Sequence, residues 1–326
     1  MSEWRYWLNE QRGTLLGLVI FLAMFVVYIA NHPAGLTANV AQTAANKGVL
    51  LAFVAMAQAL VVITAGIDLS VGMIFILTNC IASYIVAGSA GTAALGVVGV
   101  LLAGAACGGV NGLLVIHGRL QPIVATISTG AIYFGLALLL RPFPGGGVNE
   151  DLADALTGRL FGVIPSSLLL LLGVVVVVWI PFRKSLLGRA AYAAGSAEAA
   201  AYMSGVPLKR GKFAAYVLGG FFAGMGGLFL TFFTYTGDAA YQSGSGYTLW
   251  SIAAVVLGGV SLFGGRGSAV GAIFGAFAAR TTGDMLFVFD VDPLWQPLLQ
   301  GVVLLIAVSI GAVTLFRVRN RLEWFQ

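Results

Sequence analysis

Apolar runs dominate this chain, and each is long enough to cross a lipid bilayer as a helix. A membrane helix needs roughly 17 to 25 predominantly apolar residues. About ten such runs lie along the 326 residues, near 14–30, 47–65, 71–87, 92–116, 121–140, 165–181, 212–236, 248–263, 268–285 and 295–315. Only 9% of the residues are charged, whereas an ordinary soluble domain carries about 25%. We therefore expect an all-α polytopic membrane protein of about ten transmembrane helices, with residues 1–326 forming a single transmembrane domain.

The charges between the runs predict which helix ends lie inside the cell, because loops rich in Lys and Arg stay in the cytoplasm. The segment 182–212 holds six basic residues and one acidic residue, whereas the segment 141–164 holds two basic and three acidic residues. We therefore expect 182–212 to be cytoplasmic and 141–164 to lie outside. An even number of spans then places both termini of this multi-pass protein in the cytoplasm. The basic residues serve as topology signals on this interpretation, which argues against a nucleic-acid partner.

The stretch Gly66-Ile67-Asp68-Leu69-Ser70-Val71-Gly72 places an acidic residue between helix-breaking glycines inside apolar sequence. A broken helix at membrane depth must be surrounded by protein or by a water-filled path. Asp68 or Ser70 can accept hydrogen bonds from the free amides of a helix that begins near Leu69 or Val71. The charge rule places Asp68 near the cytoplasmic end of its span, which favours a hinge over contact with a solute. We assign the break to Gly66, Asp68, Ser70 and Gly72.

A short helix is predicted inside the cytoplasmic segment 182–212. Ser196 is a good N-cap, Glu198 lies in the first turn, and Gly205 followed by Pro207 ends the helix. A solvated connector is the plain alternative, yet a face of small alanines suits docking into the groove of a partner. The candidate docking residues are Gly195, Ser196, Glu198, Ala199, Ala200 and Gly205.

Several polar residues lie in or beside the apolar runs and can line a path for a hydroxylated solute, although each alone is more often an interhelical hydrogen bond. They are Gln58, Asn79, Asn111, Gln121, Thr126 and Ser128. Arg280 and Asp284 lie one helical turn apart, where opposite charges can pair. Glycines at helical spacing predict close helix packing: Gly104, Gly108 and Gly112; Gly220 and Gly224; and Gly267, Gly271 and Gly275.

The sequence contains no nucleotide-binding Gly-x-x-x-x-Gly-Lys-Ser/Thr pattern and no histidine or carboxylate cluster typical of a metal site. We therefore predict no catalytic residues, no metal and no cofactor in this chain. Any hydrolysis of ATP has to take place in another subunit.

Three segments, in order, carry a specific resemblance: Gly66 to Gly72, Gly188 to Pro207, and Leu257-Gly258-Gly259-Val260-Ser261-Leu262-Phe263-Gly264-Gly265. Over nearly its whole length the chain resembles the permease subunits of bacterial ribose, xylose and galactofuranose-type ABC importers. The resemblance implies a non-enzymatic subunit in the bacterial inner (plasma) membrane that carries a sugar from the periplasm to the cytoplasm. It implies three partners: an ATP-binding cassette ATPase that binds ATP, a periplasmic sugar-binding protein, and a second permease copy or paralogue. It also implies that the helix 196–205 is similar to the coupling helix that docks into the ATPase.

Two positions depart from the pattern of these permeases. Ser196 stands where the family usually has Asn, and Thr248 stands where a Glu often precedes the leucine at position 249. The alternative function is an ion- or proton-coupled secondary transporter of a small polar solute. Such a transporter would need ionisable residues near the membrane midplane, whereas the charges here lie mostly at the ends of the predicted spans.

Overall fold

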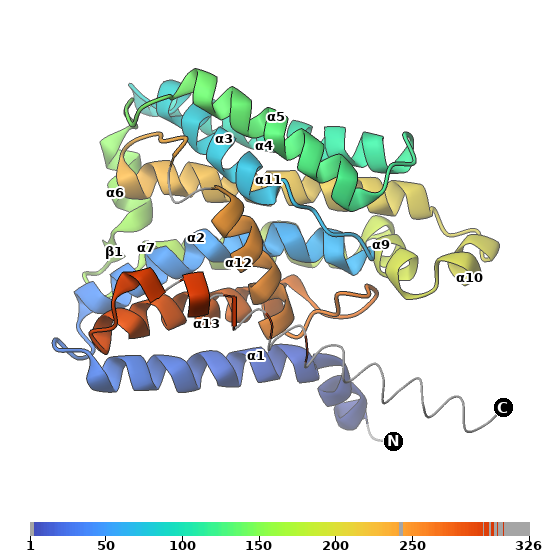
Figure 1. The fold of residues 1–326 in the computed structure, drawn as a ribbon, viewed down its shortest axis with the longest axis horizontal. Helices are drawn as coiled ribbons and strands as arrows, with labels where there is room; N and C mark the ends of the chain where they lie inside the picture. Colours follow the sequence, from blue (N-terminus) through green and yellow to red (C-terminus); the bar gives the residue numbers. More distant parts are fainter. Residues whose placement is uncertain are drawn as a thin grey trace.

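The computed structural model describes residues 3–240, 244–295, 297–299, 301, 302, 305 and 309. This part of the chain is almost entirely helical (Figure 1). Its helices in chain order are α1 (Glu3–Asn31), α2 (Ala38–Ile63), α3 (Val71–Ile85), α4 (Ala90–Ile116), α5 (Pro122–Leu140), α6 (Glu150–Thr157), α7 (Ser166–Val174), α8 (Ile180–Lys184), α9 (Leu186–Ser196), α10 (Glu198–Met203), α11 (Leu208–Thr234), α12 (Gly244–Leu257) and α13 (Ala269–Val288). A π-helical turn, η1 (Val175–Trp179), joins α7 to α8, and a 3-10 turn, η2 (Pro293–Trp295), follows α13. The strands β1 (Arg159–Leu160) and β2 (Ile164–Pro165) form a small antiparallel hairpin.

The prediction of an all-α polytopic membrane protein is confirmed, but the count of about ten spans is not. Six helices of the described part are long and apolar enough to cross a membrane: Gln11–Asn31 within α1, α2, α4, α5, Ser166–Lys184 across α7 to α8, and α11. The predicted runs 71–87 and 248–263 give the shorter helices α3 and α12. The predicted run 295–315 lies mostly outside the described residues.

The short helices have physical causes. α3 has 15 residues and is therefore about 22 Å long at 1.5 Å per residue, because the break at Asp68 delays its start. α12 ends at Leu257, where Gly258 and a left-handed Gly259 (φ 73°) turn the chain. Both helices fall short of the ~30 Å hydrocarbon core of a bilayer.

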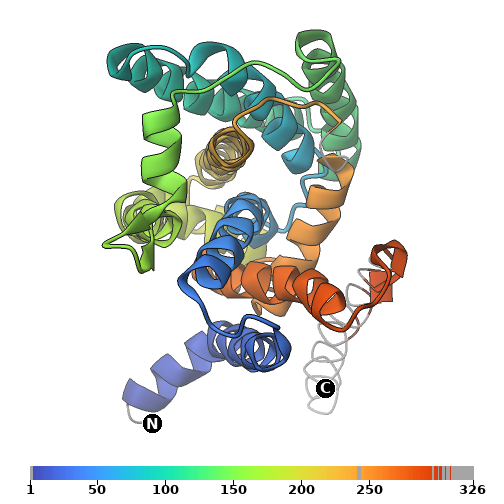
Figure 2. The same cartoon turned by 90° about the vertical axis from the view of Figure 1, so that its left-hand side faces the viewer.

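α2 lies at the centre of the bundle. Viewed end-on, it is surrounded by α11, α12, α13 and α7 (Figure 2), and 94% of its most apolar window is buried. A helix that is apolar on all sides is expected in such a position. α1 lies on the outside against α13, and only 11% of its window is buried, so most of its surface is available to lipid.

The glycine series bring helices into close contact, as predicted, except at Gly267, which lies in the loop before α13 with φ 109°. A Cβ atom at Gly108 of α4 would lie 2.1 Å from the carbonyl oxygen of Tyr216 in α11, and one at Gly220 would lie 2.1 Å from that of Gly104. Similarly, a Cβ at Gly275 of α13 would lie 1.9 Å from the carbonyl oxygen of Ala254 in α12. Larger residues at these three glycines would force the helix pairs apart.

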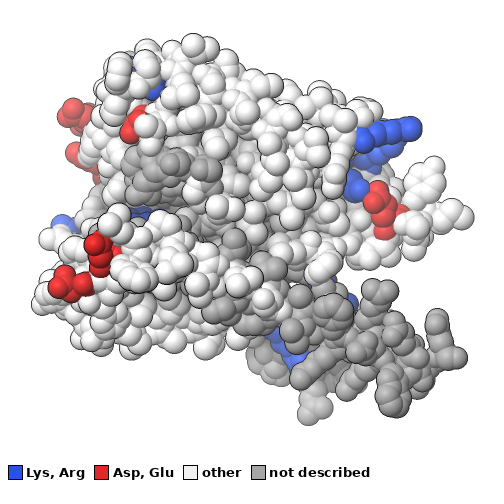
Figure 3. All heavy atoms as spheres, in the orientation of Figure 1, with Lys and Arg blue, Asp and Glu red and all other residues white. Residues whose placement is uncertain are grey.

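The two charged segments lie at opposite ends of the bundle. α6, in the acidic segment 141–164, is at the left of Figure 1, and α9 and α10, in the basic segment 182–212, are at the right. Figure 3, drawn in the same orientation, shows acidic side chains mainly at the left end and basic side chains mainly at the right end. This arrangement agrees with a helix bundle that faces different compartments at its two ends.

The charge rule predicts the orientation, which single cysteines can test. In a variant with Cys80 and Cys107 replaced by alanine, Ala155→Cys on the exposed face of α6 should react with a membrane-impermeant maleimide in intact cells. Met203→Cys at the end of α10, where Met203 is 85% exposed, should react only after the cells are permeabilised. Labelling of Met203→Cys in intact cells would contradict the predicted orientation.

Candidate functional site

The chain changes direction between α2 and α3 over residues 64–70. α2 ends in a Schellman motif, in which the amide of Gly66 donates to the carbonyl of Val61 (3.2 Å) and the amide of Ala65 donates to that of Val62 (2.9 Å). The left-handed residue of this motif is Ala65 (φ 63°), not Gly66. A non-glycine residue in this conformation is strained by about 1 kcal/mol, so the surrounding structure has to hold the break in place.

Asp68 is the buried acid at the centre of this break, and it is only 3% exposed. Its Oδ1 accepts hydrogen bonds from the backbone amide of Ser70 (2.8 Å) and from Ser70 Oγ (2.7 Å). From α4, Asn111 Nδ2 donates to Asp68 Oδ2 (3.3 Å) and to Ser70 Oγ (2.7 Å). No ion pair to Asp68 occurs within the described residues. Its carboxylate is therefore held by neutral hydrogen-bond donors.

Asn111 connects this loop to a third element, α5. Its Oδ1 accepts from Thr129 Oγ1 (2.7 Å) and from the hydroxyl of Tyr133 (3.3 Å). Asn111 is fully buried and Thr129 is 4% exposed. We call the four residues Asp68, Ser70, Asn111 and Thr129 the Asp68 clasp. The clasp occupies both ends of the Asn111 amide, so this side chain is a link between helices in the present conformation.

Two backbone amides, one just before α3 and one in its first turn, donate to side chains of distant helices. The amide of Leu69 donates to Thr126 Oγ1 of α5 (2.9 Å), and the amide of Gly72 donates to Thr248 Oγ1 of α12 (3.0 Å). Ser70 occupies the N-cap position, but its side chain makes no capping bond. Asp68 thus accepts from the amide of Ser70, the N-cap residue, whereas Thr248, the position that departs from the permease pattern, accepts from the amide of Gly72 inside α3.

Gly72 is required for this contact between α3 and α12. A Cβ atom at Gly72 would lie 1.8 Å from the carbonyl oxygen of Gly244 and 2.5 Å from Thr248 Oγ1. Gly66 is less constrained, since a Cβ there would lie 3.1 Å from Val61 Cγ1. Gly72 is therefore required for the helix contact, whereas Gly66, which looks equivalent in the sequence, is much less constrained.

The six residues predicted for a solute path do not lie together, and Ser128 is exposed on α5. Asn111 and Thr126 gather around Asp68. Asn79, farther along α3, donates to Thr231 Oγ1 (2.9 Å) and accepts from the amide of Asp238 (2.9 Å). Gln121 is exposed at the start of α5. Gln58, in the middle of α2, is fully buried, and neither polar atom of its amide has a hydrogen-bond partner in the described part of the chain.

The predicted helix 196–205 corresponds to the shorter helix α10, and a separate helix, α9, precedes it and ends at Ser196. Ser185 caps α9 by accepting from the amide of Gly188 (3.1 Å), and α9 continues to Ser196. α10 then begins at Glu198 after an extended residue, Ala197, that makes no side-chain cap. The prediction of Ser196 as an N-cap is wrong, because Ser196 closes α9 and its hydroxyl donates back to the carbonyl of Ala193 (3.3 Å).

The end of α9 packs directly against the end of α2. A Cβ atom at Gly195 would lie 2.0 Å from the carbonyl oxygen of Ile63 and 2.6 Å from the amide of Gly265. That amide donates to the same Ile63 carbonyl (2.9 Å). Ile63 is the last residue of α2 before the break, so the basic segment and the Asp68 loop meet at one point.

α10 projects from the basic end of the bundle (Figure 1). Tyr202 is 73% exposed and Met203 is 85% exposed, and Ala199 and Ala200 are also exposed. Glu198 at its start pairs with Lys212 of α11 (2.7 Å). Large apolar side chains on a protruding end are typical of a surface that binds a partner.

Comparisons with known proteins agree over most of the chain. A family model described as branched-chain amino acid transport system / permease component matches residues 40–308. A probable ABC transporter permease of Sinorhizobium fredii is 38% identical over 280 residues, which cover 84% of this chain and 80% of the relative. The ribose import permease of Bacillus subtilis is 34% identical over 309 residues, 92% of each chain. The fructose import permease of Rhizobium meliloti is 33% identical over 269 residues, 80% of this chain and 74% of the relative. No solved structure matches this chain.

Removing the Asp68 carboxylate should destabilise the protein. Asp68→Ala leaves the amide and the hydroxyl of Ser70 without their buried acceptor and removes the weaker of the two acceptors of Asn111 Nδ2, and such a loss costs about 1–3 kcal/mol. We expect a lower Tm for Asp68→Ala and a smaller decrease for Asp68→Asn, which keeps one acceptor oxygen. Asp151→Ala, an exposed acid on α6, is the matched control. An unchanged Tm in Asp68→Ala would show that the clasp contributes no stability.

Proposed function

This chain belongs to the family of transport-system permease components, and from that premise we propose that it carries a sugar from the periplasm to the cytoplasm as the membrane subunit of an ATP-binding cassette importer. The observation that carries the proposal is the similarity to ribose and fructose import permeases over 92% and 80% of this chain. The family description itself names branched-chain amino acids. The relatives over most of the chain therefore favour a sugar as the substrate.

The surroundings of Asp68 also favour ATP-driven import over an ion- or proton-coupled secondary transporter. A coupled transporter needs an ionisable group that can gain and lose its ion. Asp68 is the only acidic or basic residue buried in the described part of the chain, and the clasp satisfies its carboxylate. This arrangement supports a structural carboxylate.

An importer of this kind works with other subunits. We infer an ATP-binding cassette ATPase that binds and hydrolyses ATP, a periplasmic sugar-binding protein, and a second permease copy or paralogue. The multi-pass chain would then lie in the bacterial inner membrane with both termini in the cytoplasm. The protruding α10, at the basic end of the bundle, supports the placement of the ATPase at that end.

We further propose that the segment 182–212 transmits the ATPase movement, and that α10 is its docking element. Ala199 and Ala200 are exposed on α10, and their small side chains suit docking into a groove of the partner. Gly205, left-handed with φ 71°, ends this element. Just before α10, Gly195 at the end of α9 packs against the Ile63 carbonyl. A movement of α10 therefore has a short route to the α2–α3 break.

ATP-dependent uptake tests the proposed function. In proteoliposomes that contain the permease, its ATPase and its binding protein, labelled ribose or fructose should accumulate with ATP and fail to accumulate with a non-hydrolysable analogue. The measurement is the amount of labelled sugar inside the vesicles. Uptake of leucine in place of both sugars would contradict the sugar assignment, and uptake driven by an ion gradient without ATP would contradict the importer mechanism.

A charged side chain on α10 should uncouple the ATPase. Ala200→Glu adds bulk and charge to an exposed face, so expression and Tm should stay unchanged while substrate-stimulated ATP hydrolysis is lost. Ala155→Glu on the exposed face of α6 is the matched control at the opposite end of the bundle, and it should keep normal stimulation. Normal stimulation in Ala200→Glu would refute docking through α10.

A further inference from the structure

A cavity of about 440 Å³ opens between the ends of α1, α2 and α13, away from the Asp68 clasp. Its charged and aromatic lining comes from Tyr28, His32, Lys47, Arg280, Asp284 and Phe287. Cavities of roughly 300–1,000 Å³ are typical of small-molecule sites. The proposed transport function assigns no role to this cavity.

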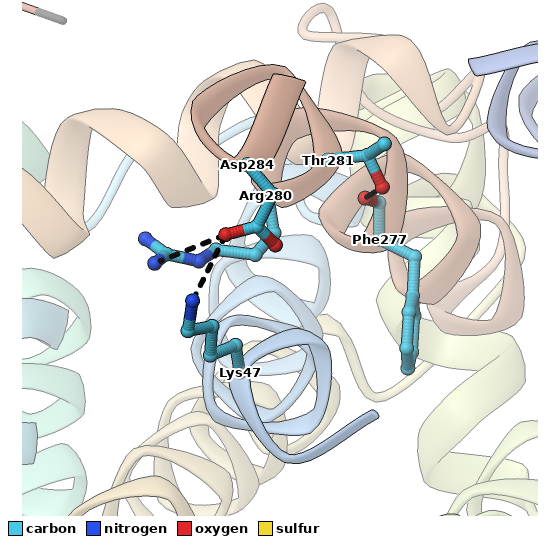
Figure 4. A network of polar contacts seen from close by, with 5 residues as sticks. All are labelled: Lys47, Phe277, Arg280, Thr281 and Asp284. Carbon is cyan, nitrogen blue, oxygen red and sulfur yellow. Dashed lines mark hydrogen bonds and ion pairs between the residues drawn. The ribbon is translucent and has the colours of Figure 1, made fainter. Parts of the chain in front are cut away.

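Two cations and one carboxylate meet at the wall of the cavity (Figure 4). Lys47 Nζ of α2 donates to Asp284 Oδ1 of α13 at 3.0 Å. Arg280 Nη2 lies 3.8 Å from the same oxygen, which confirms the pair that the sequence predicts. The Asp284 side chain is 12% exposed, and it holds both cations on one side of α13. Counting +2 for the cations and −1 for Asp284 leaves a net charge of +1.

The cations keep unused donors. Arg280 Nε is buried and has no acceptor in the described part of the chain. A guanidinium has five N–H donors and an ammonium has three. Among the described residues, Lys47 has one acceptor and Arg280 has only the long contact to Asp284. A buried donor without an acceptor, such as Arg280 Nε, is costly. The cavity therefore presents positive charge and hydrogen-bond donors to whatever enters it.

The position of the cavity indicates where a ligand would come from. The membrane-length part of α1 ends at Asn31, and Tyr28 and His32 line the cavity on either side of that end. Phe287 at the rim is 77% exposed. The cavity thus lies at the end of a helix long and apolar enough to cross a bilayer, next to apolar surface.

We propose that this cavity binds a phosphate-bearing anion through Lys47 and Arg280. Guanidinium and ammonium groups bind phosphate oxygens by charge-assisted hydrogen bonds, and both cations line the cavity with part of their side chains exposed. A bound phosphate would join α2 to α13 beside the existing contact with Asp284. An anionic phospholipid headgroup and free phosphate share this chemistry, and the experiment distinguishes them.

Binding to the purified full-length permease tests the site. Native mass spectrometry with added phosphatidylglycerol should detect a bound lipid on the wild type, and Arg280→Gln should weaken that binding about tenfold, because one charge-assisted contact is lost. Lys47→Gln, on the other helix, is a second variant that tests the same site if Arg280→Gln folds poorly. Arg159→Gln, an exposed arginine of β1 outside the cavity, is the matched control and should bind as the wild type does.

The Tm with inorganic phosphate and with phosphatidylcholine separates the two sources. A rise in the Tm of the wild type with phosphatidylglycerol, and none with phosphate alone, would assign the site to a lipid headgroup. A rise with phosphate alone that is lost in Lys47→Gln would assign it to the free anion. Equal binding of phosphatidylglycerol and phosphatidylcholine by the wild type and both variants, with no response to phosphate, would overturn the proposal.

Discussion

The burial of Asp68 at a break between two membrane helices is the constraint on which the surrounding structure depends. Polar backbone and a carboxylate at such depth must find partners within the protein. Here the partners come from three further helices: Asn111 of α4, Thr126 of α5 and Thr248 of α12. The close approach of α3 to α12 at Gly72 follows from the same need, because Thr248 reaches the Gly72 amide only across a contact that excludes a Cβ atom. The break is thus a junction of five helices.

The end of α2 connects this junction to the basic end of the bundle. The carbonyl of Ile63, the last residue of α2, accepts from the amide of Gly265 and lies against Gly195 at the end of α9. Tyr192 of α9 adds a hydrogen bond to the carbonyl of Gly267 (2.7 Å). α9, the glycine-rich loop after α12 and the end of α2 therefore form one packed unit. This packing is the physical basis for the proposal that a displacement of α10 reaches the α2–α3 break.

Local features of this fold could be predicted from the sequence, whereas contacts between distant residues could not. The apolar runs locate the helices because each run carries its own signal, and glycine spacing predicts the packed faces. The Gly72–Thr248 hydrogen bond joins residues 176 positions apart, and the Lys47–Asp284 contact joins residues 237 apart. No local pattern contains them. Ser196 shows the opposite error, since a strong local cap signal was overridden by α9, which is capped earlier at Ser185 and continues through Ser196.

The polar residues inside the apolar runs look alike in the sequence, but the structure divides them by hydrogen-bond satisfaction. Asn79, Asn111 and Thr126 have partners on neighbouring helices, so a solute could contact them only by displacing those partners. Gln58 differs, because its amide is fully buried in the central helix α2 and has no partner in the described part of the chain. A buried amide without a hydrogen-bond partner lowers the stability of the fold. Among the predicted path residues within the bundle, Gln58 is therefore the one whose hydrogen-bonding groups remain available to a polar solute or to a neighbouring helix in another conformation.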